Sequence, residues 1–222
     1  MTVSVPSLSL ADEFWLLGHD EVSGRAHVSR RVLYLGVGGA LLGELVLADR
    51  LTVTDGLVSV VDGGDQGDAA TGTALRVIGH NQRAGALHPA RTWVEYLGGQ
   101  FGERTYAAVT RRLEIARLVK PIRTGGLLRA SRFVAADQQV GMRPRIGLSW
   151  AIERRTWPGQ QAATLAGLVL AVGLAGMVRP YEHSHVLDEG LRWLSGQLPP
   201  ELGAVVAGVE AAVSALAGAA RR

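Results

Sequence analysis

RRVLYLGVGGALLGELVLADRL, the stretch from residue 30 to residue 51, largely determines how the rest of the chain must fold. Ser29 precedes it in the position of a helix N-cap, and the pattern predicts a helix from Arg30 to about Ala48. Apolar side chains form one stripe along this helix, made by Leu35, Leu42, Leu45 and Val46. Three glycines leave room for close contact with other helices: Gly36, Gly39 and Gly43. We therefore expect other helices to pack tightly against this one.

Further helices are predicted on both sides of this stretch. Ser9 and Asp12 form a capping box ahead of a first helix, which Gly18 ends. Later helices are expected at residues 73–80, 90–97, 103–119, 146–155, 162–178, 184–198 and 201–220. The segment 162–178 carries no charge, and 202–220 carries only Glu210. Because 162–178 is borderline in length and only weakly hydrophobic, it is predicted to be a buried core helix rather than a membrane span.

Two β-hairpins are expected between the helices. Asp55-Gly56 is a strong two-residue turn signal between apolar runs, so residues 51–61 are predicted to form the first hairpin. A loop rich in glycine and aspartate follows at residues 62–72. Gly125-Gly126 opens the second hairpin, which is expected at residues 127–136.

Composition limits the class of protein. With 222 residues, 47% of them hydrophobic, the chain is long enough to bury a core without covalent cross-links. It has no cysteine, which favours a reducing, cytoplasmic interior. A net charge of +3 is low for a diffuse nucleic-acid binder. We expect an all-α fold with two short hairpins, as a single helical domain over residues 8–222 after a flexible N-terminus at 1–7.

The chemical motifs do not support catalysis. Residues 36–39 are glycine-rich but lack the preceding strand and third glycine of a nucleotide-binding loop. Residues 182–188 hold two histidines and two carboxylates, but they lie at a loop-to-helix junction without a recognised ligand spacing. The aspartates of residues 62–68 lack the glutamate of a calcium loop. We therefore expect no enzyme, no cofactor and no metal site.

Four segments, in order, carry a family resemblance. LSLADEFWLL at residues 8–17 is leucine-rich with an acidic pair, and GALLGELVLADRL at 39–51 follows the pattern G-x-x-L-x-E-L-x-L-x-x-R-L. Residues 66–68 read Gln-Gly-Asp, similar to a Thr-Gly-Asp turn motif, and TWVEYL at 92–97 has a Trp-Ile-Glu-Leu-Leu-like pattern. Together they resemble the Golgi phosphoprotein 3 (GPP34) family over about residues 8–198, and the chain is identified as a bacterial member.

The resemblance implies an all-α fold around a buried central helix, for which residues 162–178 are the candidate. It also implies a peripheral membrane protein that binds phosphatidylinositol 4-phosphate. In the family the pocket uses a tryptophan and an arginine on the second helix, and two basic residues on the helix before the second hairpin. Ser29 and Gly38 occupy the first two positions here. Arg111 fits one of the later positions, and Ala108 occupies the other.

Four arginines remain near these positions and form the candidate headgroup site: Arg30, Arg31, Arg111 and Arg112. Arginine suits phosphate because its planar guanidinium donates two parallel hydrogen bonds. The alternative, that these are ordinary arginines on solvated helix faces, fits the sequence equally well. The second hairpin also differs from the family, because it carries Arg129 and Arg132 where the family has an apolar tip. Such a tip suits anionic headgroups better than acyl chains.

Three functions are compared. The leading one is a non-enzymatic peripheral membrane protein, cytoplasmic or on the inner membrane face, that binds an anionic phospholipid headgroup or another phosphate-bearing ligand with altered selectivity. The alternative is a protein–protein adaptor that has lost lipid binding and uses the hairpin at 127–136 for a partner or for self-association. A nucleic-acid regulator is disfavoured by the low net charge.

Overall fold

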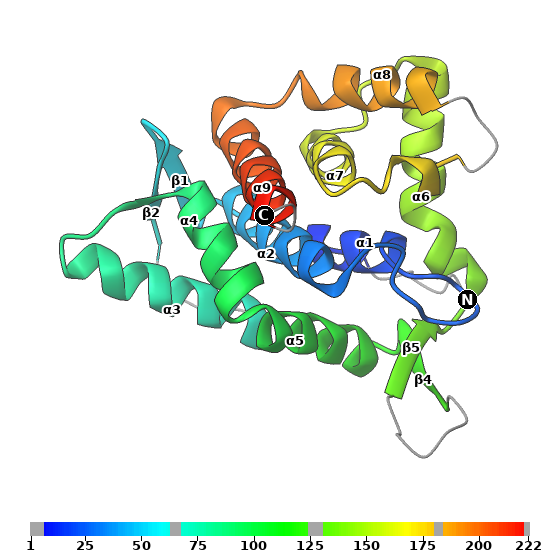
Figure 1. Cartoon of the computed structure of the whole chain (residues 1–222), viewed down its shortest axis with the longest axis horizontal. Coiled ribbons are helices and arrows are strands. Elements are labelled where there is room, and N and C mark those ends of the chain that lie inside the picture. The colour runs from blue at the N-terminus through cyan, green and yellow to red at the C-terminus, as the bar shows by residue number, and fades with distance from the viewer. Residues whose placement is uncertain (1–6, 63–67, 124–130, 180–183, 220–222) are drawn as a thin grey trace.

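The computed structural model describes residues 7–62, 68–123, 131–179 and 184–219. It consists mainly of helices, with two small antiparallel sheets at the periphery (Figure 1). The helices are α1 (Leu10–Leu17), α2 (Arg30–Leu47), α3 (Ala69–Arg83), α4 (Ala90–Val94), the π-helix η1 (Glu95–Gln100), α5 (Gly102–Ile115), α6 (Gln138–Arg154), α7 (Gln160–Ala171), the 3₁₀ helix η2 (Ala175–Met177), α8 (Ser184–Ser195) and α9 (Pro200–Ala219). The strands are β1 (Leu51–Thr54), β2 (Leu57–Val60), β3 (His88–Pro89), β4 (Val119–Arg123) and β5 (Ser131–Ala135). The predicted all-α class with two hairpins is confirmed.

Helix α2 lies at the centre of the domain, where it packs against α1, α5, α7, α9 and η1. Ser29 caps it by accepting a hydrogen bond from the Val32 N–H group. Its glycines allow this close packing, because a Cβ atom would overlap the side chains they face: Phe14 at Gly36, Val209 at Gly39 and Leu10 at Gly43. The predicted role of these glycines is confirmed.

Helix α7 is also a core helix, as the sequence predicted for residues 162–178. Every residue from Ala163 to Val169 is buried, and the helix packs against α1, α2, α6, α8 and α9. It ends sooner than expected, at Ala171, because the chain turns at Gly173, whose φ of 77° is left-handed. The resemblance implied that this segment is the buried central helix of the fold, and in the structure both α7 and α2 are central.

The first hairpin follows the prediction. β1 pairs antiparallel with β2, and Thr54 lies opposite Leu57 across the turn. Asp55 and Gly56 both adopt left-handed backbone conformations, with φ of 53° and 76°, as a two-residue hairpin turn requires. The short strand β3 adds a third member to this sheet by pairing with β2.

The second hairpin was placed wrongly by the sequence. Its strands are β4 and β5, whereas residues 119–123 were expected to end a helix or to precede the hairpin. α5 stops at Ile115 because Arg117 adopts a left-handed φ of 57°, which the helix cannot continue. Residues 124–130, which include most of the predicted turn, lie outside the described residues, as do residues 1–6 of the predicted flexible N-terminus.

Two helices begin earlier than predicted. α3 begins at Ala69, since the Asp68 carboxylate accepts hydrogen bonds from the Ala70 and Thr71 N–H groups and so caps the helix. α6 begins at Gln138 with Asp137 as its cap and continues through Pro144. Each helix starts at a polar cap that the sequence prediction had placed in a loop, for Asp68, or after the second hairpin, for Asp137.

Helix α9 closes one side of the domain. Within the described part of the chain, it is the one helix long and apolar enough to cross a membrane by length and composition. Its inner side is buried against α2, α4 and α7, at Leu202, Val205, Gly208, Val209 and Ala212.

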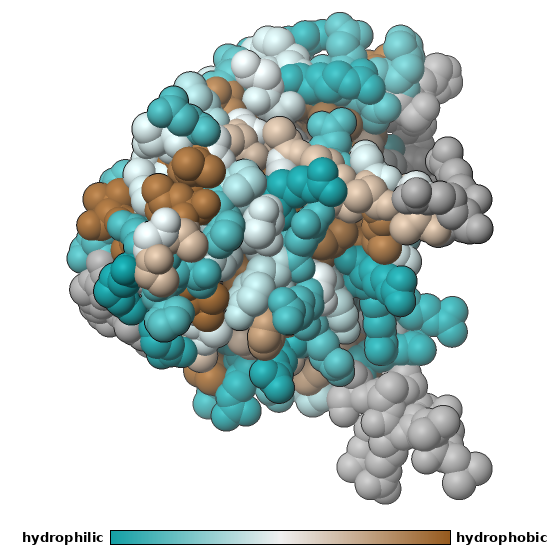
Figure 2. All heavy atoms as spheres, turned by 60° about the vertical axis from the view of Figure 1, so that its left-hand side comes forward, coloured by the Kyte–Doolittle hydropathy of each residue, from teal (hydrophilic) through white to brown (hydrophobic). Residues whose placement is uncertain are grey.

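On the side of the molecule that Figure 2 brings forward, apolar side chains lie in small groups among hydrophilic ones.

Candidate functional site

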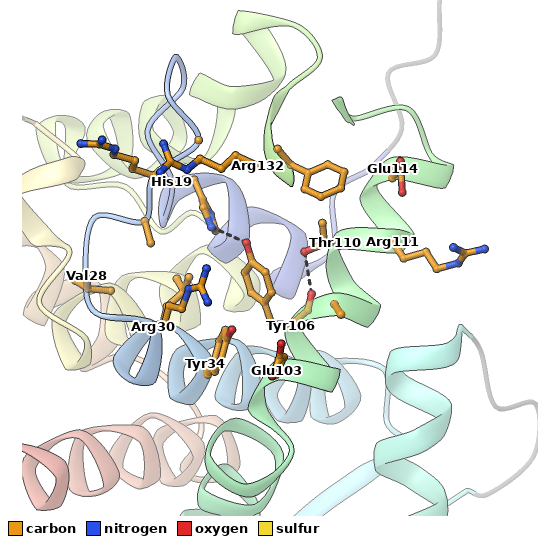
Figure 3. A pocket seen from close by; sticks show the side chains of 16 residues that line it. His19, Val28, Arg30, Tyr34, Glu103, Tyr106, Thr110, Arg111, Glu114 and Arg132 are labelled. Atoms are coloured by element: carbon orange, nitrogen blue, oxygen red, sulfur yellow. Dashed lines mark hydrogen bonds between the residues drawn. The ribbon is translucent and has the colours of Figure 1, made fainter. Parts of the chain in front are cut away.

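A pocket of about 740 Å³ opens between the loop after α1, the start of α2, the outer side of α5 and strand β5 (Figure 3). Its polar and aromatic lining comes from segments far apart in the sequence: His19, Arg25, Arg30, Tyr34, Glu103, Tyr106, Thr110, Arg111, Glu114, Arg132 and Phe133.

A chain of hydrogen bonds holds the pocket floor. The Tyr106 hydroxyl lies 2.9 Å from Nε2 of His19, and Nδ1 of His19 lies 2.6 Å from the carbonyl oxygen of Trp15. Because a carbonyl only accepts, His19 Nδ1 carries the proton and Nε2 accepts from the Tyr106 hydroxyl. The Trp15 indole donates to Thr110 Oγ1 at 2.9 Å, and Thr110 donates to the Tyr106 carbonyl. This network fixes the ring of Tyr106 under the pocket.

Burial controls the charge of His19. The imidazole stacks on the Trp15 ring, with 4.0 Å between ring centroids, and only 5% of the residue is exposed. Burial lowers the pKa of His19 to about 4, although the hydrogen bond to Trp15 opposes the shift. His19 is therefore neutral at physiological pH and acts as a hydrogen-bond acceptor for Tyr106 rather than as a cation.

The low pKa of His19 predicts a pH dependence of stability. Between pH 6.5 and about 4 the unfolded chain binds a proton at this histidine and the folded chain does not, so stability falls as pH is lowered. The expected contribution is about 2 kcal/mol between pH 7 and pH 5. In His19→Gln, urea unfolding should show a smaller loss of stability between pH 7 and pH 5, because the variant lacks this histidine. The carboxylates contribute equally to both proteins. An equal loss in both proteins would contradict the assignment.

Positive charge surrounds the pocket mouth. Four arginines line it, from the loop after α1, from α2, from α5 and from β5: Arg25, Arg30, Arg111 and Arg132. Within the described ranges none of the four forms an ion pair, although Glu103 and Glu114 also line the pocket. Figure 3 shows Arg30 beside Tyr34, whereas the Arg111 side chain extends from α5 away from Arg30 and Tyr106. These guanidinium groups are available to an anionic ligand.

Two of the four arginines predicted from the sequence line the pocket. Arg30 and Arg111 line the same pocket from different helices. Arg31 is exposed on the first turn of α2 but does not line the pocket. The sequence reading missed Arg25 and Arg132, which come from a loop and a strand. Arg132 had been noted only as part of the hairpin.

Arg112 must be removed from the predicted site. Its side chain is 15% exposed and points into the domain, away from the pocket. It pairs with Asp12 at 2.9 Å, Glu44 at 2.7 Å and Asp68 at 2.6 Å, and it donates to Ser9 Oγ. Every donor of the guanidinium faces a protein oxygen in this arrangement, so Arg112 joins α1, α2, α3 and α5 and has no donor left for a headgroup.

Gly38 and Ser29 hold structural positions here. A Cβ at Gly38 would lie 2.8 Å from the backbone nitrogen of Gly98 in η1, so this position faces a helix contact rather than the pocket. Ser29 is the N-cap of α2. Aromatic surface is supplied instead by Tyr34, four residues after Arg30, and by Tyr106, five residues before Arg111. The four-residue spacing of Arg30 and Tyr34 is a sequence signal that would have found Tyr34, whereas the five-residue spacing on α5 gives none for Tyr106.

Fold and site together define a mainly helical domain with a basic surface pocket over an aromatic floor. The chain belongs to the Golgi phosphoprotein 3 (GPP34) family, whose model matches residues 10–218. No curated protein matches the chain.

Proposed function

We propose that this protein is a non-enzymatic peripheral membrane protein that binds an anionic, phosphate-bearing lipid headgroup in the pocket between α2 and α5. The observation that carries the proposal is the set of four pocket arginines without ion pairs among the described residues. Guanidinium groups bind phosphate through paired, charge-assisted hydrogen bonds. Membership of the GPP34 family supports the same proposal, because the resemblance implies binding of phosphatidylinositol 4-phosphate.

Selectivity among headgroups is proposed to be low. Ser29 and Gly38 stand where the resemblance expects a tryptophan and an arginine, and Gly38 has no room for a longer side chain. Glu103 and Glu114 reduce the positive charge of the pocket. Binding then depends on general charge attraction, which salt screens. We also propose a cytoplasmic location in a bacterial cell, peripheral on the inner membrane face, because the absence of cysteine favours a reducing interior.

Replacing Arg30 and Arg111 by alanine together should weaken binding to anionic vesicles. Each surface arginine near an anionic bilayer contributes about 1 kcal/mol, so the double variant is expected to bind roughly 30-fold more weakly at low salt. Both side chains are exposed, and folding should be unaffected. Co-sedimentation with phosphatidylserine or phosphatidylinositol 4-phosphate vesicles, at low and high salt, measures the effect.

The matched control is Arg83→Ala/Arg91→Ala, which removes two exposed arginines from α3 and α4, outside the pocket lining. It should bind vesicles nearly as well as the natural protein. Equal losses in the two double variants would mean that overall charge, not the pocket, attaches the protein. No binding of the natural protein to any anionic vesicle at low salt would favour the adaptor function.

A further inference from the structure

A second surface with membrane-binding chemistry lies on α6. This helix runs along an outer edge of the molecule, between the β4–β5 hairpin and α8 (Figure 1). Its inner side is buried at Gly141, Pro144, Leu148, Ala151 and Ile152. Its outer side carries Ile146, Trp150 and Arg154 at four-residue spacing, which places them on one stripe. We call these three residues the α6 face.

The α6 face exposes apolar side chains that the fold does not use. Ile146 is 45% exposed and Trp150 is 54% exposed, and Trp157, just beyond the helix, is 44% exposed. By contrast, Trp15 and Trp93 are 1% and 3% exposed. A half-exposed tryptophan beside an exposed isoleucine is costly in water, and such groupings mark interaction surfaces.

Charge accompanies the apolar side chains. The Arg154 guanidinium lies 4.2 Å from the centroid of the Trp150 ring, stacked on its face. α6 carries three arginines and one glutamate, so the helix is basic. An apolar centre bordered by arginine matches the boundary between the acyl chains and the phosphates of an anionic bilayer, where tryptophan rings are also favoured.

The first half of α6, which precedes most of the α6 face, lies close to elements that line the pocket. β5 supplies Arg132 and Phe133 to the pocket lining, and α6 begins three residues after β5 ends. Arg145 of α6 forms an ion pair with Glu21 in the same loop that supplies Arg25 to the pocket. The face is one convex helix stripe at an edge, and a fluid bilayer adapts to such a shape, whereas a protein partner would need a matching concavity.

We propose that the α6 face is a second membrane contact, in which Ile146 and Trp150 enter the headgroup region of an anionic bilayer and Arg154 pairs with lipid phosphate. The contact rests on the proposed function only in requiring that the protein meets a membrane. Two linked contacts bind a surface more tightly than either alone, because the second binding step is intramolecular. The α6 face would therefore raise affinity for vesicles without changing affinity for a soluble headgroup.

The test compares Ile146→Ala/Trp150→Ala with the matched control Val61→Ala/Leu87→Ala, which shortens exposed apolar side chains elsewhere on the surface. The α6 variant should bind phosphatidylserine vesicles at least roughly fivefold more weakly, with unchanged thermal stability. The control should bind like the natural protein. Tryptophan fluorescence of the natural protein should shift to shorter wavelength on vesicle addition, and Trp150→Phe should remove much of that shift.

Calorimetric titration with soluble inositol phosphate separates this inference from the proposed function. Unchanged titration of the α6 variant together with weaker vesicle binding supports the inference. If only Arg30→Ala/Arg111→Ala loses binding and the α6 variant binds vesicles normally, the pocket is supported and the α6 contact has no effect. Normal vesicle binding by the α6 variant would overturn the inference.

Discussion

Replacing Arg112 by alanine is expected to lower the free energy of unfolding by about 3–5 kcal/mol, the usual effect of removing one partner from a buried ion pair. Without Arg112, the carboxylates of Asp12, Glu44 and Asp68 would remain close together with no cation between them. Burial alone would lower the pKa of Arg112, but these carboxylates outweigh it and raise that pKa, so the arginine stays charged. Urea unfolding followed by circular dichroism measures the loss.

The neighbouring residue provides the control. Arg111 is exposed on the same helix and has no ion pair within the described ranges, so Arg111→Ala should change stability by less than about 0.5 kcal/mol. If the two single variants were equally stable, Arg112 would not hold the domain together. The contrast also tests the site, because Arg111→Ala should weaken vesicle binding while leaving the fold intact.

The Arg112→Ala defect should depend on pH. Burial raises the pKa of Asp68, but the hydrogen bond and charge of Arg112 and the α3 N–H groups outweigh it, and the net effect lowers that pKa. This contribution to stability is therefore present above the ordinary aspartate pKa and is lost as pH falls through the folded value. In the variant most of the contribution is already absent. The difference in the free energy of unfolding between the natural protein and Arg112→Ala should narrow below about pH 4. A difference that stays constant with pH would contradict the ion-pair explanation.

Local signals explain which parts of the fold were predictable. Ser29 as a cap, the glycines of α2 and the Asp55-Gly56 turn each act within a few residues, and the structure has all of them as predicted. The end of α5 was not predictable in the same way. It depends on the left-handed backbone conformation of Arg117, and there is no glycine at this position to predict that conformation from the sequence. The early start of α6 was missed because its cap, Asp137, had been placed after a hairpin.

The candidate site was also only partly predictable, because it depends on contacts between residues far apart in the sequence. Arg111 and Arg112 are adjacent in sequence, and both looked like candidates for a phosphate. Their directions on α5 differ, and Arg112 meets carboxylates 44, 68 and 100 residues away. No local pattern encodes contacts at such distances. Arg25 and Arg132 were missed for the same reason, since the fold alone brings a loop and a strand beside α2.

Gly98→Ala should be a second large defect, lowering stability by about 3 kcal/mol, at the upper end for overpacking. Gly98 lies in η1 where it crosses α2. A Cβ there would lie 2.5 Å from the Cα of Leu35 and would overlap the carbonyl oxygen of Tyr34. The obstacle is backbone rather than a flexible side chain, so relief requires η1 and α2 to move apart. Thermal unfolding measures the loss.

Gly99 gives a control within the same π-helix. A Cβ at Gly99 would meet nothing within 4 Å, so Gly99→Ala should be nearly neutral, which separates the effect of close packing from that of losing a glycine. The Gly98 defect should also reach the pocket, because Tyr34 lines it and belongs to the turn of α2 that would be displaced. Vesicle binding of Gly98→Ala, measured below its melting transition, should therefore be weaker than that of Gly99→Ala. Equal stability of the two variants would show that α2 and η1 have room to separate, and the same slack would then permit an arginine at Gly38.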